Sequence, residues 1–214
     1  MSDRKNVLTT SRQTGRLTKR QKDILATNLG EPYLMTPDDM TEWAVQNVRP
    51  VLEVGFGMGH SLYEMALANQ DEAYCGVDLY RPGVASLLKL LLESPLPNCS
   101  VIEGNALDVL AKTPPGSLTR VQYFFPDPWP KKRHRKRRIF HTDFLELVHK
   151  ALLPGGHLYM VTDWQDYADD MRQSVPKDQW RVDECVNVVR PATKYEMRGQ
   201  RLGHHISELY YQKI

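Results

Sequence analysis

The chain has 214 residues, of which 41% are apolar and 25% charged, a composition typical of one folded globular domain. No apolar stretch is long enough to cross a bilayer, and the polar residues Asp3, Arg4 and Lys5 lack the apolar centre of a signal peptide. Three widely spaced cysteines exclude a disulfide-stapled fold and indicate reduced thiols, so the sequence predicts a cytoplasmic protein without a zinc site.

The net charge of +2 hides a strong segregation of charge. Residues 1–22 hold seven Lys or Arg against one acid, and residues 131–138 hold seven more and no acid. The remaining 14 basic residues face 25 acidic ones, which leaves the rest of the chain at −11. The pattern predicts a mobile basic arm over 1–22 and a single domain over 23–214 that repels polyanions except at its basic elements. Neither basic segment interleaves apolar residues as a membrane-surface helix would, so no membrane partner is expected.

Along the chain, short apolar runs alternate with segments of helical periodicity. Strands are expected at 51–54, 74–79, 100–102, 120–125 and 157–162, and helices at 37–48, 62–67, 82–92, 106–112 and 139–152. Repeated strand-then-helix units predict an α/β fold with a doubly wound, mainly parallel sheet and helices on both faces. Two further strands at 180–189 and 205–212, with no helix between them, would complete a seven-stranded Rossmann-like sheet with an antiparallel last strand.

A glycine turn joins the strand expected at 51–54 to the helix expected at 62–67. Its glycines are Gly55, Gly57 and Gly59, directly after Glu53 and Val54. Such glycines let a ligand approach backbone N–H groups at a helix start, although a tight crossing without a ligand has the same appearance. The G-x-G-x-G spacing and the preceding carboxylate disfavour a dinucleotide pyrophosphate and suit a cationic or zwitterionic ligand such as S-adenosylmethionine.

Three polar residues follow the next strands at the same edge of the predicted sheet. Asp78 ends the second strand, where an acid can accept hydrogen bonds from both ribose hydroxyls; the alternative is a cap on the turn at Arg81. Asn105 follows the third strand and could contact an adenine edge or belong to an ordinary turn. Asp163 follows the fifth strand, where it is a substrate contact or the N-cap of a helix.

The fourth strand leads into Phe124-Phe125-Pro126-Asp127-Pro128-Trp129-Pro130, followed at once by the basic run 131–138. The prolines restrict the backbone on both sides of Asp127, and an aromatic turn with one acceptor can stack a flat base and read its edge. The adjacent cations are expected to contact the phosphates of that base's strand. The alternative is a polar surface loop with an unspecific basic run.

These segments together resemble the bacterial tRNA (guanine-N7)-methyltransferase family. The resemblance is carried by the landmarks that follow and runs from residue 15 to residue 204: Gly15-Arg16-Leu17-Thr18, the glycine turn from Glu53 to Gly59, Phe124 to Trp129, the basic run ending Arg137-Arg138-Ile139, Thr162-Asp163-Trp164, Thr193-Lys194-Tyr195-Glu196 and Arg201-Leu202-Gly203-His204. Asp78 stands where the family usually has Glu, Asn105 where Asp is frequent, and His205 where Gly is expected after His204.

The resemblance implies a class I enzyme that transfers a methyl group from S-adenosylmethionine to a guanine N7 in the variable loop of tRNA. It implies that Glu53, Asp78, Asn105 and Asp127, with the three glycines, form the cofactor pocket, and that Asp127 is catalytic. Lys131, Asp163, Thr193, Lys194, Tyr195 and Glu196 would contact the substrate. The basic segments supply the expected phosphate contacts Arg16, Lys132, Arg133 and Arg135.

Other functions are compatible with parts of this pattern. A methyltransferase of another RNA or of a protein would share the glycine turn and Asp78 without needing the aromatic turn. A nicotinamide-dependent oxidoreductase would share the sheet but not Glu53 and the glycine spacing, and a non-catalytic RNA-binding module would not need a cofactor pocket. No obligatory protein partner is expected, and the sequence leaves open a monomer or a homodimer.

Overall fold

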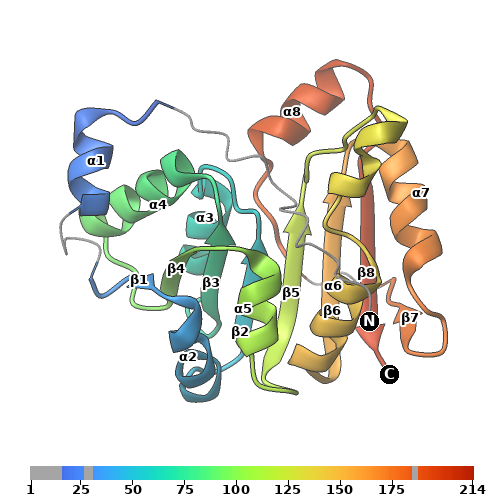
Figure 1. The fold of residues 1–214 in the computed structure, drawn as a ribbon, viewed down its shortest axis with the longest axis horizontal. Coiled ribbons are helices and arrows are strands. Elements are labelled where there is room, and N and C mark those ends of the chain that lie inside the picture. The colour runs from blue at the N-terminus through green and yellow to red at the C-terminus, as the bar shows by residue number, and fades with distance from the viewer. Residues whose placement is uncertain (1–15, 27–30, 185–187) are drawn as a thin grey trace.

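The computed structural model describes residues 16–26, 31–184 and 188–214. Its centre is an eight-stranded sheet in the order β1-β4-β3-β2-β5-β6-β8-β7 (Figure 1). The strands are β1 (Leu34–Met35), β2 (Pro50–Val54), β3 (Ala73–Asp78), β4 (Cys99–Glu103), β5 (Leu118–Phe124), β6 (Leu152–Thr162), β7 (Trp180–Val182) and β8 (Ser207–Lys213). The pairs from β1 to β6 are parallel, whereas β8 runs antiparallel to both β6 and β7.

Helices cover both faces of this sheet, as the alternation of the sequence predicts. The helices are α1 (Lys19–Ala26), α2 (Met40–Gln46), α3 (His60–Ala68), α4 (Arg81–Glu93), α5 (Ala106–Lys112), α6 (Thr142–Ala151), α7 (Gln165–Ser174) and α8 (Lys194–Arg201), with short 3-10 helices η2 (Pro37–Asp39) and η3 (Lys132–Arg137). One apolar core packs α2, α5, α6 and α7 on one face, and a second core packs α1, α3 and α4 on the other. The predicted doubly wound α/β fold is confirmed.

The structure corrects three details of the prediction. The sheet has eight strands rather than seven, because the two-residue β1 adds to β4 at one edge. The strand expected at 180–189 is only Trp180–Val182 in the described part of that segment. A helix, α8, lies between the last two strands, where none was expected, and Figure 1 shows it beyond the carboxyl end of β5.

The end of the predicted arm is folded. Helix α1 begins at Lys19, buries Ile24 and packs against α4, where Arg20 Nη2 lies 2.6 Å from Glu93 Oε1. Residues 1–15 lie outside the described part of the chain, so the remainder of the arm stays a prediction. No helix of the described residues is both long enough and apolar enough to cross a bilayer.

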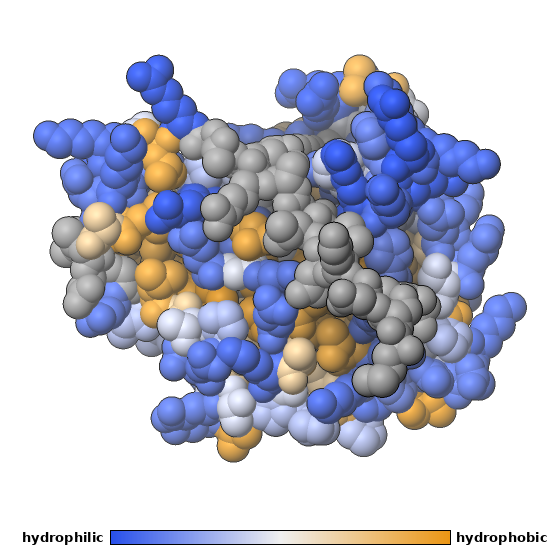
Figure 2. Space-filling view, in the orientation of Figure 1, coloured by the Kyte–Doolittle hydropathy of each residue, from blue (hydrophilic) through white to orange (hydrophobic). Residues whose placement is uncertain are grey.

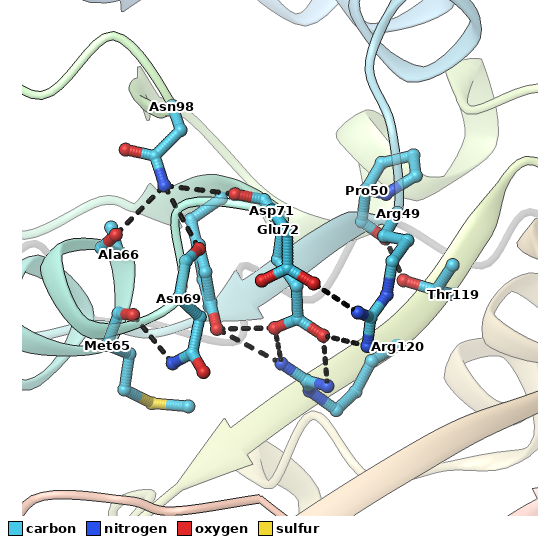
Figure 3. A network of polar contacts seen from close by, with 11 residues as sticks. Arg49, Pro50, Met65, Ala66, Asn69, Asp71, Glu72, Asn98, Thr119 and Arg120 are labelled. Carbon is cyan, nitrogen blue, oxygen red and sulfur yellow. Dashed lines mark hydrogen bonds and ion pairs between the residues drawn. The ribbon is translucent and has the colours of Figure 1, made fainter.

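A buried polar network ties the amino ends of the central strands together (Figure 3). Arg120 on β5 donates from Nη2 to Glu72 Oε2 at 2.6 Å, and Arg49 Nη2 donates to Glu72 Oε1 at 2.9 Å. Burial would raise the pKa of Glu72, but the hydrogen bonds and charge of Arg120 outweigh it and lower the pKa below its ordinary value. The ionised carboxylate therefore pairs with the buried Arg120 and with the exposed Arg49 at the surface.

The side chain of Asn98 hydrogen-bonds to three backbone carbonyls in the same region (Figure 3). Its Nδ2 donates to the carbonyl oxygens of Ala66, Asn69 and Glu72 at 2.9, 3.3 and 3.0 Å.

We expect Asn98→Ala to lower the free energy of unfolding by about 1–3 kcal/mol, because these carbonyls lose their donor. Urea denaturation measures the effect. Gln46→Ala, which removes an exposed hydrogen bond to Glu42, is the control and should cost less than about 0.5 kcal/mol.

Candidate active site

A cavity of about 840 Å³ opens at the carboxyl ends of the parallel strands. The glycine turn, the ends of β3 and β5, the start of α5, the aromatic turn and α8 form its walls. The predicted cofactor residues all line it: Glu53, Gly55, Gly57, Gly59, Asp78, Asn105 and Asp127. Residues separated by more than 70 positions in the chain thus face one space, as expected for strands that end at one edge of a parallel sheet.

The glycine turn is held in a shape that side chains disfavour. Gly55, Gly57 and Gly59 have φ values of 73°, 59° and 79°. A Cβ on Gly55 or Gly57 would meet no atom within 4 Å, so the neighbouring space is open to a ligand, whereas a Cβ on Gly59 would lie 2.6 Å from Leu87 Cβ. The first two glycines leave room beside the backbone, and the third allows α3 to pack against α4.

Asp78 fixes the glycine turn from the neighbouring strand. Its Oδ2 accepts a hydrogen bond from Gly57 N–H at 2.9 Å, and its Oδ1 accepts one from Tyr80 N–H at 2.8 Å. The second bond closes a local turn at Tyr80, whereas the start of α4 at Arg81 receives no side-chain cap, so the alternative role expected for Asp78 is found one residue earlier in the chain. Burial raises the pKa of Asp78 despite these hydrogen bonds, and the charge of Asp127 contributes to the increase.

Glu53 is the most deeply buried acid of the cavity, with 3% of its surface exposed. Burial, and next the charge of Asp78, raise the pKa of Glu53 from 4.5 to about 8, while Arg190 and Arg120 oppose the shift. In the amide orientation that satisfies its neighbours, Gln122 donates to Glu53 Oε2 at 3.3 Å and accepts from Arg120 Nε at 2.9 Å. A polar chain therefore joins Glu53 to the pair of Arg120 and Glu72 at the amino ends of the strands.

Asn105 is the N-cap of α5. Its Oδ1 accepts the N–H of Leu107 at 3.0 Å, so the turn role considered for it is present. This bond uses the amide oxygen, and the amide nitrogen makes no hydrogen bond to the described residues. The nitrogen is therefore the atom with which Asn105 can act on a ligand in the cavity.

Asp127 lies in a strained turn at the mouth of the cavity. Phe125 and Trp129 on either side of it have φ values of 45° and 44°, a region that bulky residues rarely adopt. Each such residue costs about 1–3 kcal/mol and persists only where the surroundings hold it. The Asp127 carboxylate is exposed to the open cavity, yet the walls desolvate it enough to raise its pKa above the ordinary value.

The predicted substrate residues divide into two groups. Thr193 and Lys194 line the main cavity at the start of α8, where Thr193 Oγ1 accepts from Glu196 N–H at 3.1 Å and Glu196 reaches back to the Thr193 N–H. This capping box starts α8, in a segment where no helix was expected. The backbone of Tyr195 belongs to α8, and its side chain lies outside the described part of the structure.

Asp163 lines a separate, smaller cavity of about 340 Å³ with Trp164, Asp166 and both histidines of the last loop. Its Oδ2 lies 3.2 Å from His204 Nδ1, and Trp164 rather than Asp163 is the N-cap of α7, so the predicted capping role is wrong. Gly199 of α8 packs so closely that a Cβ there would lie 3.0 Å from Asp163 Oδ2. Asp163 thus contacts the helix that borders the main cavity.

Comparisons with known proteins show the family of this chain. Residues 47–209 match a family model described as "Putative methyltransferase". The chain is 41% identical over 215 residues to the tRNA (guanine-N(7)-)-methyltransferase of Serratia proteamaculans, and 39% identical over 211 residues to that of a Shewanella species. Each alignment covers 94% of this chain and 89% of the relative. The chain belongs to the tRNA (guanine-N(7)-)-methyltransferase family.

Solved structures support the fold of this methyltransferase independently of its sequence. The crystal structure of the 16S rRNA (adenine(1408)-N(1))-methyltransferase from Catenulisporales acidiphilia superposes with a TM-score of 0.57 at 18% identity, over 84% of this chain and 93% of that one. A variant of the same enzyme solved with cosubstrate SAM has a TM-score of 0.54 at 15% identity, over 84% and 92%. At this identity the likeness establishes the class I methyltransferase fold alone.

The basic run of the methyltransferase is not uniform. Lys131, Lys132, Arg133 and Lys136 are exposed and form no ion pair within the described ranges. Arg135 is half-buried and donates to Asp166 Oδ1 at 2.6 Å. Figure 2 shows hydrophilic side chains gathered at the upper right, where Figure 1 places the yellow segment after β5. The predicted phosphate contacts thus differ: Lys132 and Arg133 project freely, whereas Arg135 is engaged by an acid.

Two buried arginines beside the cavity were missed by the sequence analysis. Arg138 ends the basic run with 3% of its surface exposed, and its guanidinium lies 4.4 Å above the Tyr167 ring. The Arg190 guanidinium donates to Glu196 and, at 2.9 Å, to Glu208 Oε1, and it lies 5.5 Å from the centre of the Phe125 ring. No local signal distinguishes these arginines from exposed ones, because their acidic partners come from other elements.

Proposed function

We propose that this methyltransferase transfers a methyl group from S-adenosylmethionine to N7 of a guanine in the variable loop of tRNA. The observation that supports it best is the convergence of the glycine turn, Glu53, Asp78 and Asp127 on one cavity. The named activity of the relatives, at about 40% identity over nearly the whole chain, supports the same reaction.

The residues present fit S-adenosylmethionine. The open space beside Gly55 and Gly57 admits a ligand against the backbone. Glu53, once ionised, suits the ammonium of the methionine part, and Asp78 retains acceptor capacity for ribose hydroxyls while it holds Gly57 N–H. The Asn105 amide nitrogen suits an adenine acceptor. When bound, this cosubstrate supplies an electrophilic methyl group on a sulfonium.

The chemistry at guanine requires orientation rather than a base. N7 carries a lone pair and no proton, so the new N–CH₃ bond forms without proton removal while the S–CH₃ bond of the sulfonium breaks. The positive charge moves to the guanine ring, and the neutral thioether S-adenosylhomocysteine is the leaving group. Asp127 would accept hydrogen bonds from guanine N1–H and the exocyclic amine, which orients the base and stabilises the developing charge. Orientation of this kind contributes on the order of 7–11 kcal/mol to lowering a barrier.

The exposed part of the basic run would bind tRNA phosphates. Lys131, Lys132, Arg133 and Lys136 are available, and Arg16, which is also exposed, would add a contact from the arm. N7 of a paired guanine lies in a deep, narrow groove, so the substrate guanine is expected in an unpaired segment.

The salt dependence of tRNA binding tests these contacts. We expect the double change Lys132→Ala and Arg133→Ala to reduce the slope of log affinity against log salt by about 1.4–1.8, since each phosphate contact contributes roughly 0.7–0.9. Filter binding across a salt series measures it. Arg172→Ala is the control, because this exposed arginine pairs with Asp169 on α7. An unchanged slope in the double variant would refute the phosphate contacts.

The reaction is tested directly by incubating the protein with labelled S-adenosylmethionine and bulk tRNA. N7-methylguanine is then mapped by borohydride reduction and aniline cleavage. Cleavage at a variable-loop guanine supports the proposal. Label in ribosomal RNA or protein alone would favour the other methyltransferase functions, and no cosubstrate binding by calorimetry would favour a non-catalytic RNA-binding module.

A further inference from the structure

The turn that presents Asp127 is strained at both ends, so its position depends on what holds those ends. Phe125 and Trp129 both have positive φ values. Three residues of the segment are prolines, which have no N–H to donate to a neighbouring strand. A strained backbone keeps its shape only where its neighbours over-determine it. The contacts at each end therefore decide where the carboxylate stands.

The first end is held by the sheet. Phe125 N–H donates to Val161 O at 2.7 Å, which extends the pairing of β5 with β6 by one residue. Arg190 lies over the rings of Phe124 and Phe125 at 5.7 and 5.5 Å. At this end the turn therefore continues the regular pairing of β5 with β6.

At the second end the Trp129 ring contacts His134 and the Arg137 guanidinium, which lies 4.8 Å from the ring centre, whereas the backbone carbonyl of Pro128 is held by the side chain of Arg138. Arg138 donates to the carbonyl oxygen of Pro128 from Nε at 2.9 Å and from Nη2 at 2.6 Å. Pro128 has no N–H of its own, and its carbonyl precedes the strained Trp129. Two bonds from one planar group fix the direction of that carbonyl as well as its distance.

Helix α7 in turn holds Arg138. Its Nη2 donates to Asp166 Oδ2 at 2.8 Å, its Nη1 donates to Asp170 Oδ2, and the guanidinium lies over the Tyr167 ring. The guanidinium donors point to these protein acceptors and only 3% of the residue is exposed, so no face remains for an RNA phosphate. Arg138 is thus chemically unlike the exposed cations that precede it.

We propose that Arg138 is a positioning residue for methyl transfer, which links the Asp127 turn to α7 through the carbonyl of Pro128, and that it does not contact the phosphates of tRNA. The inference rests on the proposed function for its kinetic readout only. The Arg138 guanidinium fixes the orientation of the turn, the turn fixes Asp127, and Asp127 orients the guanine.

Arg138→Lys is the decisive variant, since it keeps the charge but replaces a planar fork by a single ammonium. An ammonium cannot reach Pro128 O and both carboxylates in the same geometry. A displacement of about 1 Å can cost about 10²-fold in rate, so we expect the single-turnover rate to fall roughly 10²-fold. The dissociation constant for tRNA and its salt slope should stay within twofold of wild type.

Hydrogen exchange of the segment 123–130 provides a readout that does not depend on activity. The Phe125 amide, which donates to Val161 O, should exchange at least tenfold faster in Arg138→Lys than in wild type, because release of the far end loosens the turn back to the sheet. Loss of exchange protection without loss of rate would show that the turn is anchored but the anchor does not position the carboxylate, which would overturn the proposal. An unchanged exchange rate would overturn it as well.

Two variants keep the test decisive. Lys132→Ala removes an exposed cation of the same run and should lower the salt slope, the signature that Arg138→Lys must lack. A reduced salt slope in Arg138→Lys would identify a phosphate contact and reject the proposal.

Should Arg138→Lys fold poorly, Asp170→Asn weakens the same anchor from α7 and should slow methyl transfer several-fold at unchanged tRNA affinity. A wild-type protein that does not methylate tRNA would reject the proposed function, while hydrogen exchange would still test the anchor.

Discussion

Asp127→Asn is expected to lower the single-turnover rate of methyl transfer by about 10²- to 10³-fold, the loss typical of removing one preorganised electrostatic partner. The dissociation constant for tRNA should change by less than threefold, because the exposed cations rather than this carboxylate supply most of the binding energy. Asparagine keeps the shape of the side chain but loses the charge and one acceptor oxygen. A rapid-quench measurement with saturating tRNA isolates this step.

The pH dependence of the wild-type enzyme gives a second view of Asp127. Burial raises the pKa of this carboxyl, so the rate should decline on acidification at a higher pH than an ordinary aspartate would require. Asp143→Asn, an exposed acid at the start of α6, is the matched control and should leave the rate unchanged. Equal losses of rate and tRNA affinity in Asp127→Asn would reject the orienting role.

The site was predictable where it depends on strand order. Glu53, Asp78, Asn105 and Asp127 each follow or end a strand, and the carboxyl ends of parallel strands meet at one edge. Their common cavity therefore follows from the alternation of apolar runs and helical segments alone, with no need for knowledge of side-chain packing.

Helix α8 was missed because its sequence has no apolar stripe. Its residues are mostly charged or polar, and Gly199 lowers the helix propensity further. The capping box of Thr193 and Glu196 was the available signal, and it starts the helix although the amino-acid composition gives a low helix propensity. The reason for Gly199 is tertiary, since its missing side chain lets α8 approach Asp163 on the neighbouring strand end.

The basic run shows what local sequence cannot resolve. Arg133, Arg135 and Arg138 look equivalent in the chain, yet one is exposed, one pairs with Asp166 and one is buried under the aromatic turn. The difference arises from Asp166 and Asp170 on α7, 28 and 32 residues after Arg138. Only the packing of α7 against this segment decides which cation remains available to RNA.

Glu53→Gln is expected to weaken S-adenosylmethionine binding by about 10- to 100-fold, since a charge-assisted hydrogen bond contributes roughly 1.5–3 kcal/mol. In the free protein the pKa of Glu53 is about 8, so the side chain is mostly protonated at pH 7. An ammonium placed beside it favours the carboxylate, so binding at pH 7 should release close to one proton. Calorimetry in buffers of different ionisation enthalpy measures that release, and Glu53→Gln should abolish it.

The same substitution should stabilise the free protein at alkaline pH. The folded state holds the Glu53 proton up to about pH 8, whereas the unfolded state loses it near the ordinary value of 4.5. Wild-type stability therefore falls between pH 4.5 and 8 through this group, and Glu53→Gln should be more stable above pH 8 by a few kcal/mol, at about 1.4 kcal/mol per pKa unit. Below pH 4.5 the two proteins should unfold alike, because the carboxyl is neutral in both states. Thermal melts across this range measure the effect, and a Glu53→Gln variant that is less stable at every pH would contradict it. Unchanged cosubstrate affinity in Glu53→Gln would show that Glu53 faces a part of the ligand other than the ammonium.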